Sequence, residues 1–290
     1  MQMNKVMVIT DSNAGIKSQE LKQNLTIVPM PFMIDENEYF EDINLSVSQF
    51  YEFLTQDKKV STSQPSPADV LEFWNKAIKD GKEVVYIPMS SGLSMSYQTA
   101  LMLSADFKDK VFVVDAKKIS VTQKQACLDA IELANQGKSA KEIKEILESN
   151  NGKSSIYIMV DTLKYLKRGG RITPVVAAFG ALLKIKPVLQ IQGDKLDSFA
   201  KVLNVSQAKQ KMIGAIRRDI ETRFVDEYKA GQLVLSIAHT NNREKAEEFA
   251  TEIKLAFPDI EFAFVDELSL SVACHIGPGA LGVAITKKLS

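Results

Sequence analysis

The sequence predicts an α/β fold of two domains, with a largely parallel sheet in the N-terminal domain and a mixed sheet in the C-terminal domain. The chain has 290 residues, a length that suggests about two domains. Short β-branched runs alternate with helical patterns, which is typical of βα units. The run Asn-Asn-Gly-Lys at residues 150–153 interrupts this alternation, so we place one domain over residues 1–152 and the other over residues 153–290.

The N-terminal domain begins with a buried strand and continues as βα units. Apolar, β-branched runs predict strands at residues 6–10, 84–89 and 111–115. Helical periodicity predicts helices at residues 46–54, 67–80, 95–105, 122–136 and 140–149. Gly137 ends the fourth of these helices, and Ser139 caps the fifth together with Glu142.

The C-terminal domain shows a different order of elements. Strands are predicted at residues 156–160, 184–192, 195–202, 233–239, 261–265 and 280–286, and helices at residues 162–167, 206–228 and 244–257. Gly193 and Asp194 form a tight turn between two of these strands, which makes that pair antiparallel. The sheet of this domain is therefore expected to be mixed.

The composition is that of an ordinary globular protein without a basic excess. Lysine and arginine together number 36, as do aspartate and glutamate, so the net charge is zero. Nucleic-acid binders usually carry a basic face, and we expect no nucleic-acid partner. Cys127 and Cys274 lie in apolar segments without metal-ligand spacing, which favours buried thiols, no metal site and a cytoplasmic location.

Neither a signal peptide nor a membrane span is predicted. The N-terminal apolar run is too short for the core of a signal peptide. The longest weakly polar stretch, residues 174–183, is far shorter than a transmembrane helix. We therefore expect a soluble protein that would hold any lipid in its interior. No cofactor is predicted, and the lack of a P-loop predicts that the isolated protein has no ATPase activity.

Two serine-rich segments of the N-terminal domain are candidates for ligand binding. The first, residues 61–67, places hydroxyls, including that of Thr62, in a proline-rich loop; taken alone it indicates a helix N-terminus. The second, residues 90–97, follows a strand and opens a helix, where free backbone amides and the helix dipole favour an anion. We expect Ser94 to be the hydroxyl donor there, and helix capping by serine is the alternative.

A short basic helix with two terminal glycines is predicted in residues 161–172. Gly169 and Gly170 end the helix, and the basic residues before them complement its last carbonyls. That structural account explains every residue of the segment except Arg171, which is free to point at a ligand or a partner.

A histidine beside a glycine-rich loop is the fourth candidate. His275 directly precedes Gly-Pro-Gly in residues 275–282. The glycines let the chain bend closely around a ligand. The other histidine, His239, ends a predicted strand and is expected to be structural.

Together the four segments resemble the DegV family. The motifs TSQPS, SSGLSxSYQ, DTLKYLKRGGRI and HxGPGALGV stand in the family's order and at its distances, and TDS and GKSAKEIKEIL also fit. The resemblance spans the whole chain, and LKRGGRI and HxGPG are its most discriminating parts. It implies two α/β domains with a long-chain fatty acid bound between them.

The resemblance also implies a function and a set of contacts. Characterised members are the binding subunit of a two-part fatty acid kinase. They present the carboxyl group to a separate ATP-binding protein, which makes the acyl phosphate used in phospholipid synthesis, so a lipid-binding subunit rather than an enzyme is implied. The family's carboxylate contacts match Thr62, Ser94 and His275, and its arginine matches Arg171, which would share that site or meet the kinase.

These residue types suit a fatty-acid carrier. Hydroxyls and an imidazole can hydrogen-bond a carboxylate without a fixed cation that would hinder release. The tail supplies affinity, because at roughly 0.8 kcal/mol per methylene a sixteen-carbon chain gives an upper bound near ~12 kcal/mol before binding costs. The apolar residues 175–183 are expected either to line a tunnel for the tail or to form helix-packed core.

Three segments depart from the family's pattern. Met95 stands where many relatives have glycine, which would narrow the mouth of the site. Residues 201–205, with Leu203 and Asn204 at their centre, replace a basic turn whose arginine matters for the kinase in coupled relatives. This second departure leaves fatty-acid binding unaffected and makes the kinase partnership the open part of the prediction. The third departure is in residues 115–122, which are less rich in glycine and serine than is usual in the family.

The competing prediction is a serine hydrolase or esterase. Residues 92–96 lie between a strand and a helix and nearly match the G-x-S-x-G nucleophile motif, with Ser94 as the nucleophile. His275 follows in the chain order of α/β-hydrolases, and Asp161 or Asp266 would be the acid. Against this prediction, Ser96 replaces the last glycine and no HGGG-type oxyanion loop is present.

Overall fold

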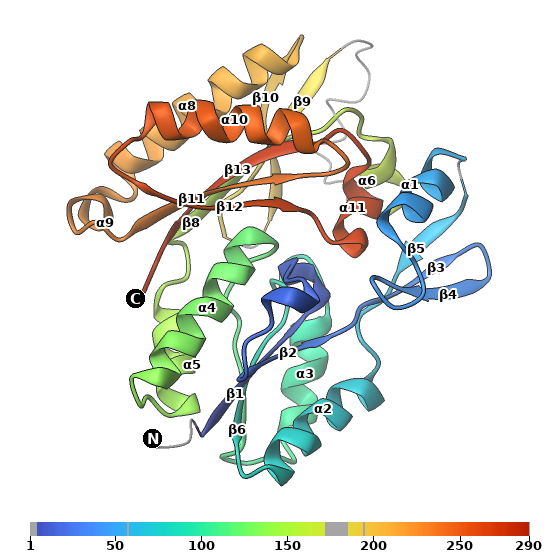
Figure 1. Cartoon of the computed structure of the whole chain (residues 1–290), viewed down its shortest axis with the longest axis vertical. Coiled ribbons are helices and arrows are strands. Elements are labelled where there is room, and N and C mark those ends of the chain that lie inside the picture. The colour runs from blue at the N-terminus through green and yellow to red at the C-terminus, as the bar shows by residue number, and fades with distance from the viewer. Residues whose placement is uncertain (1–4, 57, 172–184, 194, 290) are drawn as a thin grey trace.

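The computed structural model of the chain describes residues 5–56, 58–171, 185–193 and 195–289. These residues form two α/β bodies, one above the other in Figure 1, with a small third sheet at their side. The apolar segment 175–183, expected to line a tunnel or to form core, lies outside the described residues.

The first sheet has four strands, all parallel, in the order β2-β1-β6-β7. It is covered on both faces, which suits a parallel sheet because such strands bury both sides. Helices α4 and α5 pack on one face, and α2 and α3 on the other (Figure 1). The strands are β1 (Val6–Asp11), β2 (Leu25–Val28), β6 (Glu83–Ile87) and β7 (Val111–Val113), and the helices are α2 (Pro67–Lys79), α3 (Ser96–Ser104), α4 (Val121–Asn135) and α5 (Ala140–Ser149).

The side chains of β1 alternate between the two helical layers. Val8 packs with residues of α4 and α5, whereas Ile9 packs with Trp74 of α2. The predicted parallel sheet is therefore confirmed, together with its helices, but strand β2 was not predicted from the sequence. It is only four residues long and is followed by two prolines, so no run of alternating residues marks it.

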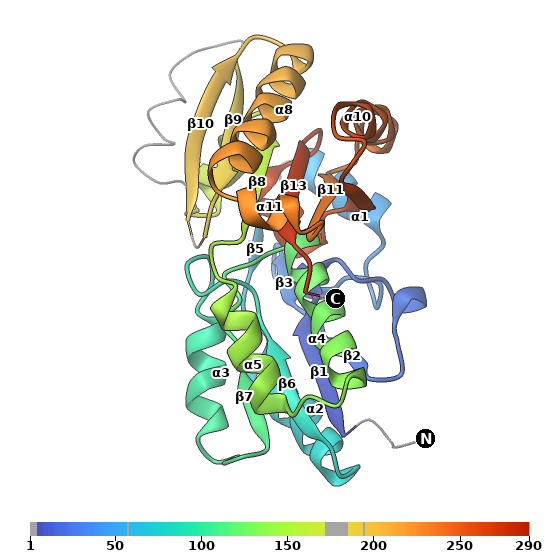
Figure 2. The ribbon, with the colours of Figure 1, turned by 90° about the vertical axis from the view of Figure 1, so that its left-hand side faces the viewer.

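The second sheet has six strands in the order β10-β9-β8-β13-β11-β12. Only β11 and β12 pair in parallel, and the other neighbours are antiparallel, which confirms the predicted mixed sheet. Figure 2, turned by 90°, shows this sheet above the first one. Its strands are β8 (Ser154–Met159), β9 (Lys186–Ile191), β10 (Leu196–Val202), β11 (Leu233–His239), β12 (Glu261–Glu267) and β13 (Leu281–Lys287).

The two faces of the second sheet have different neighbours. The outer face buries side chains of α8 (Val205–Thr222) and α10 (Arg243–Ala256). The inner face turns toward the first body and packs against residues around the start of α4. The single long helix predicted over 206–228 is in fact α8 followed by α9 (Val225–Lys229), because the chain breaks at Phe224 and buries its ring in the outer core.

The third sheet was not predicted from the sequence. It is antiparallel, in the order β4-β3-β5, and is accompanied by the predicted helix, α1. Its elements are β3 (Pro31–Ile34), β4 (Asn37–Phe40), α1 (Val47–Thr55) and β5 (Val60–Thr62). Strands of three or four residues show no usable alternation. Contacts with the C-terminal half stabilise them instead.

The third sheet packs against two short helices of the C-terminal half, α6 (Lys164–Arg168) and α11 (Leu270–Ile276) (Figure 1). Phe32 and Phe50 meet edge to face in this core, with ring centroids 6.1 Å apart. Residues 31–62 thus precede the predicted boundary at 152/153 yet contact the body that follows it. The boundary itself stays a prediction.

Over the described ranges, no helix combines the length and the apolar character needed to cross a membrane. The same ranges hold no group of three or more acidic, histidine or cysteine side chains placed to bind a metal ion. Cys127 and Cys274 are both buried free thiols, and burial raises the pKa of each to about 12. Both thiols are thus protonated at neutral pH and fill space in the core.

Candidate ligand-binding site

A cavity of about 120 Å³ lies between the inner face of the second sheet and the first body. Along most of its length the walls are aliphatic side chains of the sheet and of the segment before α4. Because inner-face residues of a strand recur at every second position, β8 contributes two of them. These apolar residues include Ile156, Ile158, Ile191, Leu196, Ala238, Ala284 and Ile119.

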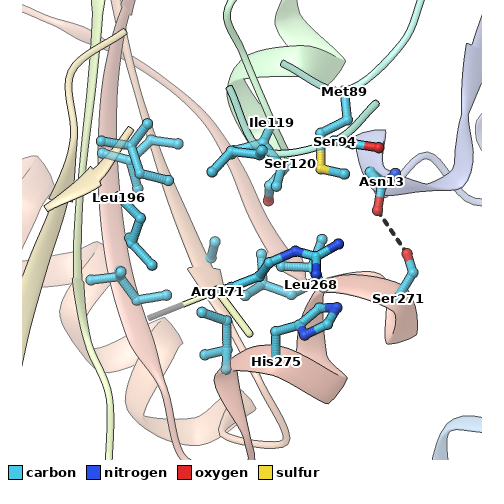
Figure 3. A pocket seen from close by; sticks show the side chains of 18 of the residues that line it. Asn13, Met89, Ser94, Ile119, Ser120, Arg171, Leu196, Leu268, Ser271 and His275 are labelled. Carbon is cyan, nitrogen blue, oxygen red and sulfur yellow. Dashed lines mark hydrogen bonds between the residues drawn. The ribbon is translucent and has the colours of Figure 1, made fainter. Parts of the chain in front are cut away.

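One end of the cavity is polar. Figure 3 shows Leu196 among carbon-only side chains at the apolar end, and Ser94, Ser120, Arg171 and His275 at the opposite end. Thr62 also lines the cavity. The structure therefore brings together all four residues that the sequence singled out, from β5, the loop before α3, the end of α6, and α11. Their role as ligand contacts stays a prediction.

Thr62 and His275 form a hydrogen bond at this end. The distance between Thr62 Oγ1 and His275 Nε2 is 2.9 Å. The other ring nitrogen, Nδ1, is buried and has no hydrogen-bond partner among the described residues. Burial of the ring, and secondly the charge of Arg171, lower the pKa of His275 to about 4. The imidazole is therefore uncharged at neutral pH.

Arg171 supplies the fixed positive charge of the polar end. Its guanidinium lies beside the His275 ring and extends across the cavity (Figure 3). One of its nitrogens donates to the carbonyl of Gly169 at 2.9 Å, and its backbone amide donates to the carbonyl of Leu166 at 3.0 Å. The side chain is exposed, so it is open both to the cavity and to solvent.

Ser94 lies at the start of α3 and takes part in its first turn. Its Oγ is 2.7 Å from Oγ of Ser96 and accepts a hydrogen bond from the Ser96 amide at 3.1 Å. Both interpretations of this serine therefore coexist, since it bonds the first turn of the helix and also lines the cavity. Met95, expected to narrow the mouth, is 65% exposed and lies outside the set of lining residues.

Two glycines allow the LKRGGR and HIGPG segments to pack closely against each other. A Cβ atom on Gly169 would overlap Nδ1 of His275, and one on Gly277 would overlap the ring of Tyr165. The prediction that the two glycines of the GGR motif end a helix is confirmed, since Gly169 is the C-cap residue of α6 and Gly170 follows it with a φ of +65°. Gly169 has an ordinary φ of −78° and is needed for space.

Several polar residues of the site were missed. Ser271 donates to Oδ1 of Asn13 at 2.8 Å, which ties α11 to the end of β1 (Figure 3). Asn13 follows β1 at the carboxyl end of a parallel strand, a place where ligands often bind, so the run TDSN could have signalled it. Helix α11 itself was not predicted, because seven residues cover too few turns to show a period.

The arrangement does not form a hydrolase triad. Ser94 pairs with Ser96 and not with His275, whose Nε2 is bonded to a threonine. No acid orients the ring, since Nδ1 has no partner in the described part of the chain. Asp161 and Asp266, the predicted acids, form ion pairs with lysines at 2.6 and 2.8 Å. The hydrolase prediction is therefore not favoured.

Comparison with known proteins identifies close counterparts over the whole length. A family model described as "Uncharacterised protein, DegV family" matches residues 5–288. A DegV domain-containing protein of Clostridium perfringens is 30% identical over 290 residues, and the match covers 97% of each chain.

Solved structures show the same fold. A DegV protein of Bacillus subtilis, described as a fatty acid binding protein, is 28% identical, with a TM-score of 0.82, over 98% of this chain and 99% of that one. A fatty acid binding DegV family protein of Streptococcus agalactiae is 25% identical, with a TM-score of 0.86 and the same coverage. Since the family model, the relatives and the fold agree over nearly all of its residues, this chain belongs to the DegV family.

Proposed function

We propose that this protein binds one long-chain fatty acid, with the tail along the inner face of the second sheet and the carboxylate at Thr62, Ser94, His275 and Arg171. The shape of the cavity carries the proposal, because an apolar channel that ends in hydroxyls, an imidazole and a guanidinium complements an amphiphilic acid. The B. subtilis and S. agalactiae proteins, which share its fold, are described as fatty acid binding.

The Thr62–His275 pair suggests how the carboxylate would be held. A neutral imidazole has one donor nitrogen and one acceptor nitrogen. If Nε2 carries the proton, it donates to Oγ1 of Thr62, and the threonine hydroxyl is then free to donate to a carboxylate oxygen. In the other tautomer Nε2 would accept a hydrogen bond from the Thr62 hydroxyl, whose proton would then be unavailable to the carboxylate. We therefore assign the proton to Nε2, and His275 acts by positioning the Thr62 hydroxyl.

Hydrogen bonds from neutral groups to a charged carboxylate stabilise a complex by about 1.5–3 kcal/mol each. Ser94 and Thr62 would each supply such a bond. Arg171 adds one exposed cation, whose attraction solvent weakens. The apolar tail then supplies most of the affinity, and the headgroup contacts fix which end of the ligand enters first.

The protein purified without detergent is expected to carry fatty acid near one molecule per chain. Denaturing extraction followed by mass spectrometry measures this, and uptake of added oleate checks any protein that emerges empty. Thr62→Val, which keeps the shape and removes the hydroxyl, should weaken oleate binding about tenfold, since it removes one charge-assisted bond. A protein that neither contains nor takes up fatty acid would contradict the proposal.

We further propose that the protein is no enzyme by itself and that, in the cytoplasm, it presents the bound acid to a separate fatty acid kinase for phospholipid synthesis. Arg171 is exposed beside the carboxylate end and could contact both ligand and partner. The departure from the family's basic turn leaves Leu203 68% exposed, while Asn204 caps α8 by accepting from the amide of Gln207.

Acyl phosphate should form only when a fatty acid kinase subunit, ATP and Mg²⁺ are added to the loaded protein. Leu203→Arg, a change at an exposed position, is expected to speed this reaction because it restores a basic residue in the turn. Arg171→Ala should stop the formation of acyl phosphate. If this variant still retains lipid, Arg171 contacts the partner; if it loses lipid, Arg171 contacts the carboxylate. Acyl phosphate made without the kinase subunit would refute the carrier role.

A further inference from the structure

Ser120 has an unusual backbone in the wall of the cavity. Its φ is +56° and its ψ is −135°, a combination that favours glycine. A side chain in such a region costs of order 1–3 kcal/mol and persists only where surrounding structure imposes it. The Ser120 amide donates to the carbonyl of Asn13 at 3.1 Å, which ties the residue to the segment after β1, and its carbonyl accepts the first helical hydrogen bond of α4 from the amide of Lys124 at 2.8 Å.

The hydroxyl of Ser120 does not cap helix α4. The residue is 7% exposed and occupies the N-cap position of α4, where a serine normally bonds an amide of the first turn. Its side chain makes no such bond, and no hydrogen bond from it is formed within residues 5–56, 58–171, 185–193 and 195–289. Figure 3 shows the oxygen pointing into the cavity on the side of Arg171.

The start of α4 adds a second attraction for an anion. The first amides of a helix have no partner within it, and the helix dipole places partial positive charge there. Helix α4 has fifteen residues, and its first residue, Val121, lines the cavity next to Ser120. In that turn the amides of Gln123 and Lys124 donate to the carbonyls of Ile119 and Ser120. The Ser120 side chain caps neither Val121 nor Thr122, so the amides of these two residues are the ones that a ligand oxygen would meet.

We propose that Ser120 and the first turn of α4 contact the ligand carboxylate and select the ionised acid against uncharged lipids of the same length. This rests on the proposed function, since it adds a further donor to the same polar end. A carboxylate oxygen of the ligand would accept a hydrogen bond from the Ser120 hydroxyl, which has no partner in the described part of the chain. The strained backbone would thereby serve binding, because an unstrained N-cap serine would turn its hydroxyl onto the helix.

Two substitutions separate the hydroxyl from the strain. Ser120→Ala removes the hydroxyl and keeps the strained backbone, whereas Ser120→Gly removes both. Both variants should bind oleate about tenfold more weakly than the wild type, the effect of one lost charge-assisted bond. Binding of methyl oleate, which has no carboxylate, should be unchanged. Ser120→Gly should also unfold at a higher temperature than Ser120→Ala.

Asp109→Gly provides the matched control. Asp109 has a similar φ of +57° in an exposed turn far from the lining of the cavity. That variant should gain thermal stability with no change in either affinity. The measurements are isothermal titration or competition with a fluorescent fatty acid, together with calorimetric melting.

The outcomes are distinguishable. Wild-type affinity for oleate in both Ser120 variants would overturn the assignment of Ser120 and leave the carrier proposal intact. An equal loss for oleate and methyl oleate would show that Ser120 only shapes the cavity, which also overturns it. A wild-type protein that binds neither lipid would refute the proposed function itself.

Discussion

Replacing Gly169 with alanine is expected to break the Thr62–His275 hydrogen bond and to weaken fatty-acid binding about tenfold or more. The added Cβ would overlap Nδ1 of His275, so the ring must move. The ring has little room, because α11 buries most of its residues against α6 and the third sheet. Overpacking of this kind lowers the free energy of unfolding by about 1–3 kcal/mol, which urea denaturation would measure.

Gly170→Ala is the matched control for this prediction. Gly169 has a backbone that alanine tolerates but no space for a methyl group, whereas Gly170 has a φ of +65° with nothing within 4 Å of an added Cβ. Gly170→Ala should therefore cost stability through its backbone while oleate binding stays near that of the wild type. Equal losses of binding in the two variants would contradict a steric role for Gly169.

A double-mutant cycle locates the clash. Removing the ring in the Gly169→Ala, His275→Ala double variant frees the space that the methyl group needs. The double variant should then be about as stable as His275→Ala alone, and the coupling energy should exceed about 1 kcal/mol. Additive losses would show that Gly169 matters for another reason.

Acidification from about pH 6.5 to pH 4 is expected to destabilise the protein through His275. Its pKa is about 4 in the folded state, against an ordinary value of 6.5. Between these values the unfolded chain binds a proton at this ring that the folded protein does not, so stability falls as the pH falls. A shift of this size corresponds to about 3 kcal/mol, fully lost only below pH 4.

The measurement is the free energy of unfolding by urea at several pH values for the wild type and for His275→Gln. Glutamine does not titrate, so the variant should show a flatter decline between pH 6.5 and 4. Other shifted groups cancel in the comparison, including His239, whose pKa burial also lowers. Parallel curves for the two proteins would show that His275 is not held neutral.

Much of the fold and the central part of the site were predictable from the sequence. Long, buried strands such as β1 and β11 show clear apolar runs, and α5 carries a complete capping box. The motif resemblance named Thr62, Ser94, Arg171 and His275, and these do meet at one end of the cavity.

The remainder depended on contacts that are distant in sequence. Strands β3, β4 and β5 are too short to show a pattern and are stabilised by packing on α11. Nothing in the sequence around Ser120 reveals its positive φ, and its amide is bonded to Asn13, which is distant in the sequence. The spatial role of Gly169 depends on a ring in a different segment of the chain.

The order of strands in the second sheet has a consequence for how the molecule is made. Strand β13 lies between β8 and β11, which do not pair with each other, so residues 281–287 join two parts of the sheet that are synthesised earlier. Its residues 282–284 also line the cavity.

While the ribosome is still adding α10 and β12, the parallel sheet of residues 6–113 can already pair, but the mixed sheet has a gap at its centre. Pairings that distant in sequence form slowly, so the inner faces of β8 and β11 stay exposed until the last strand inserts. During that interval the nascent chain offers apolar strand edges to chaperones or to other chains, and the cavity comes into existence only when the interval ends.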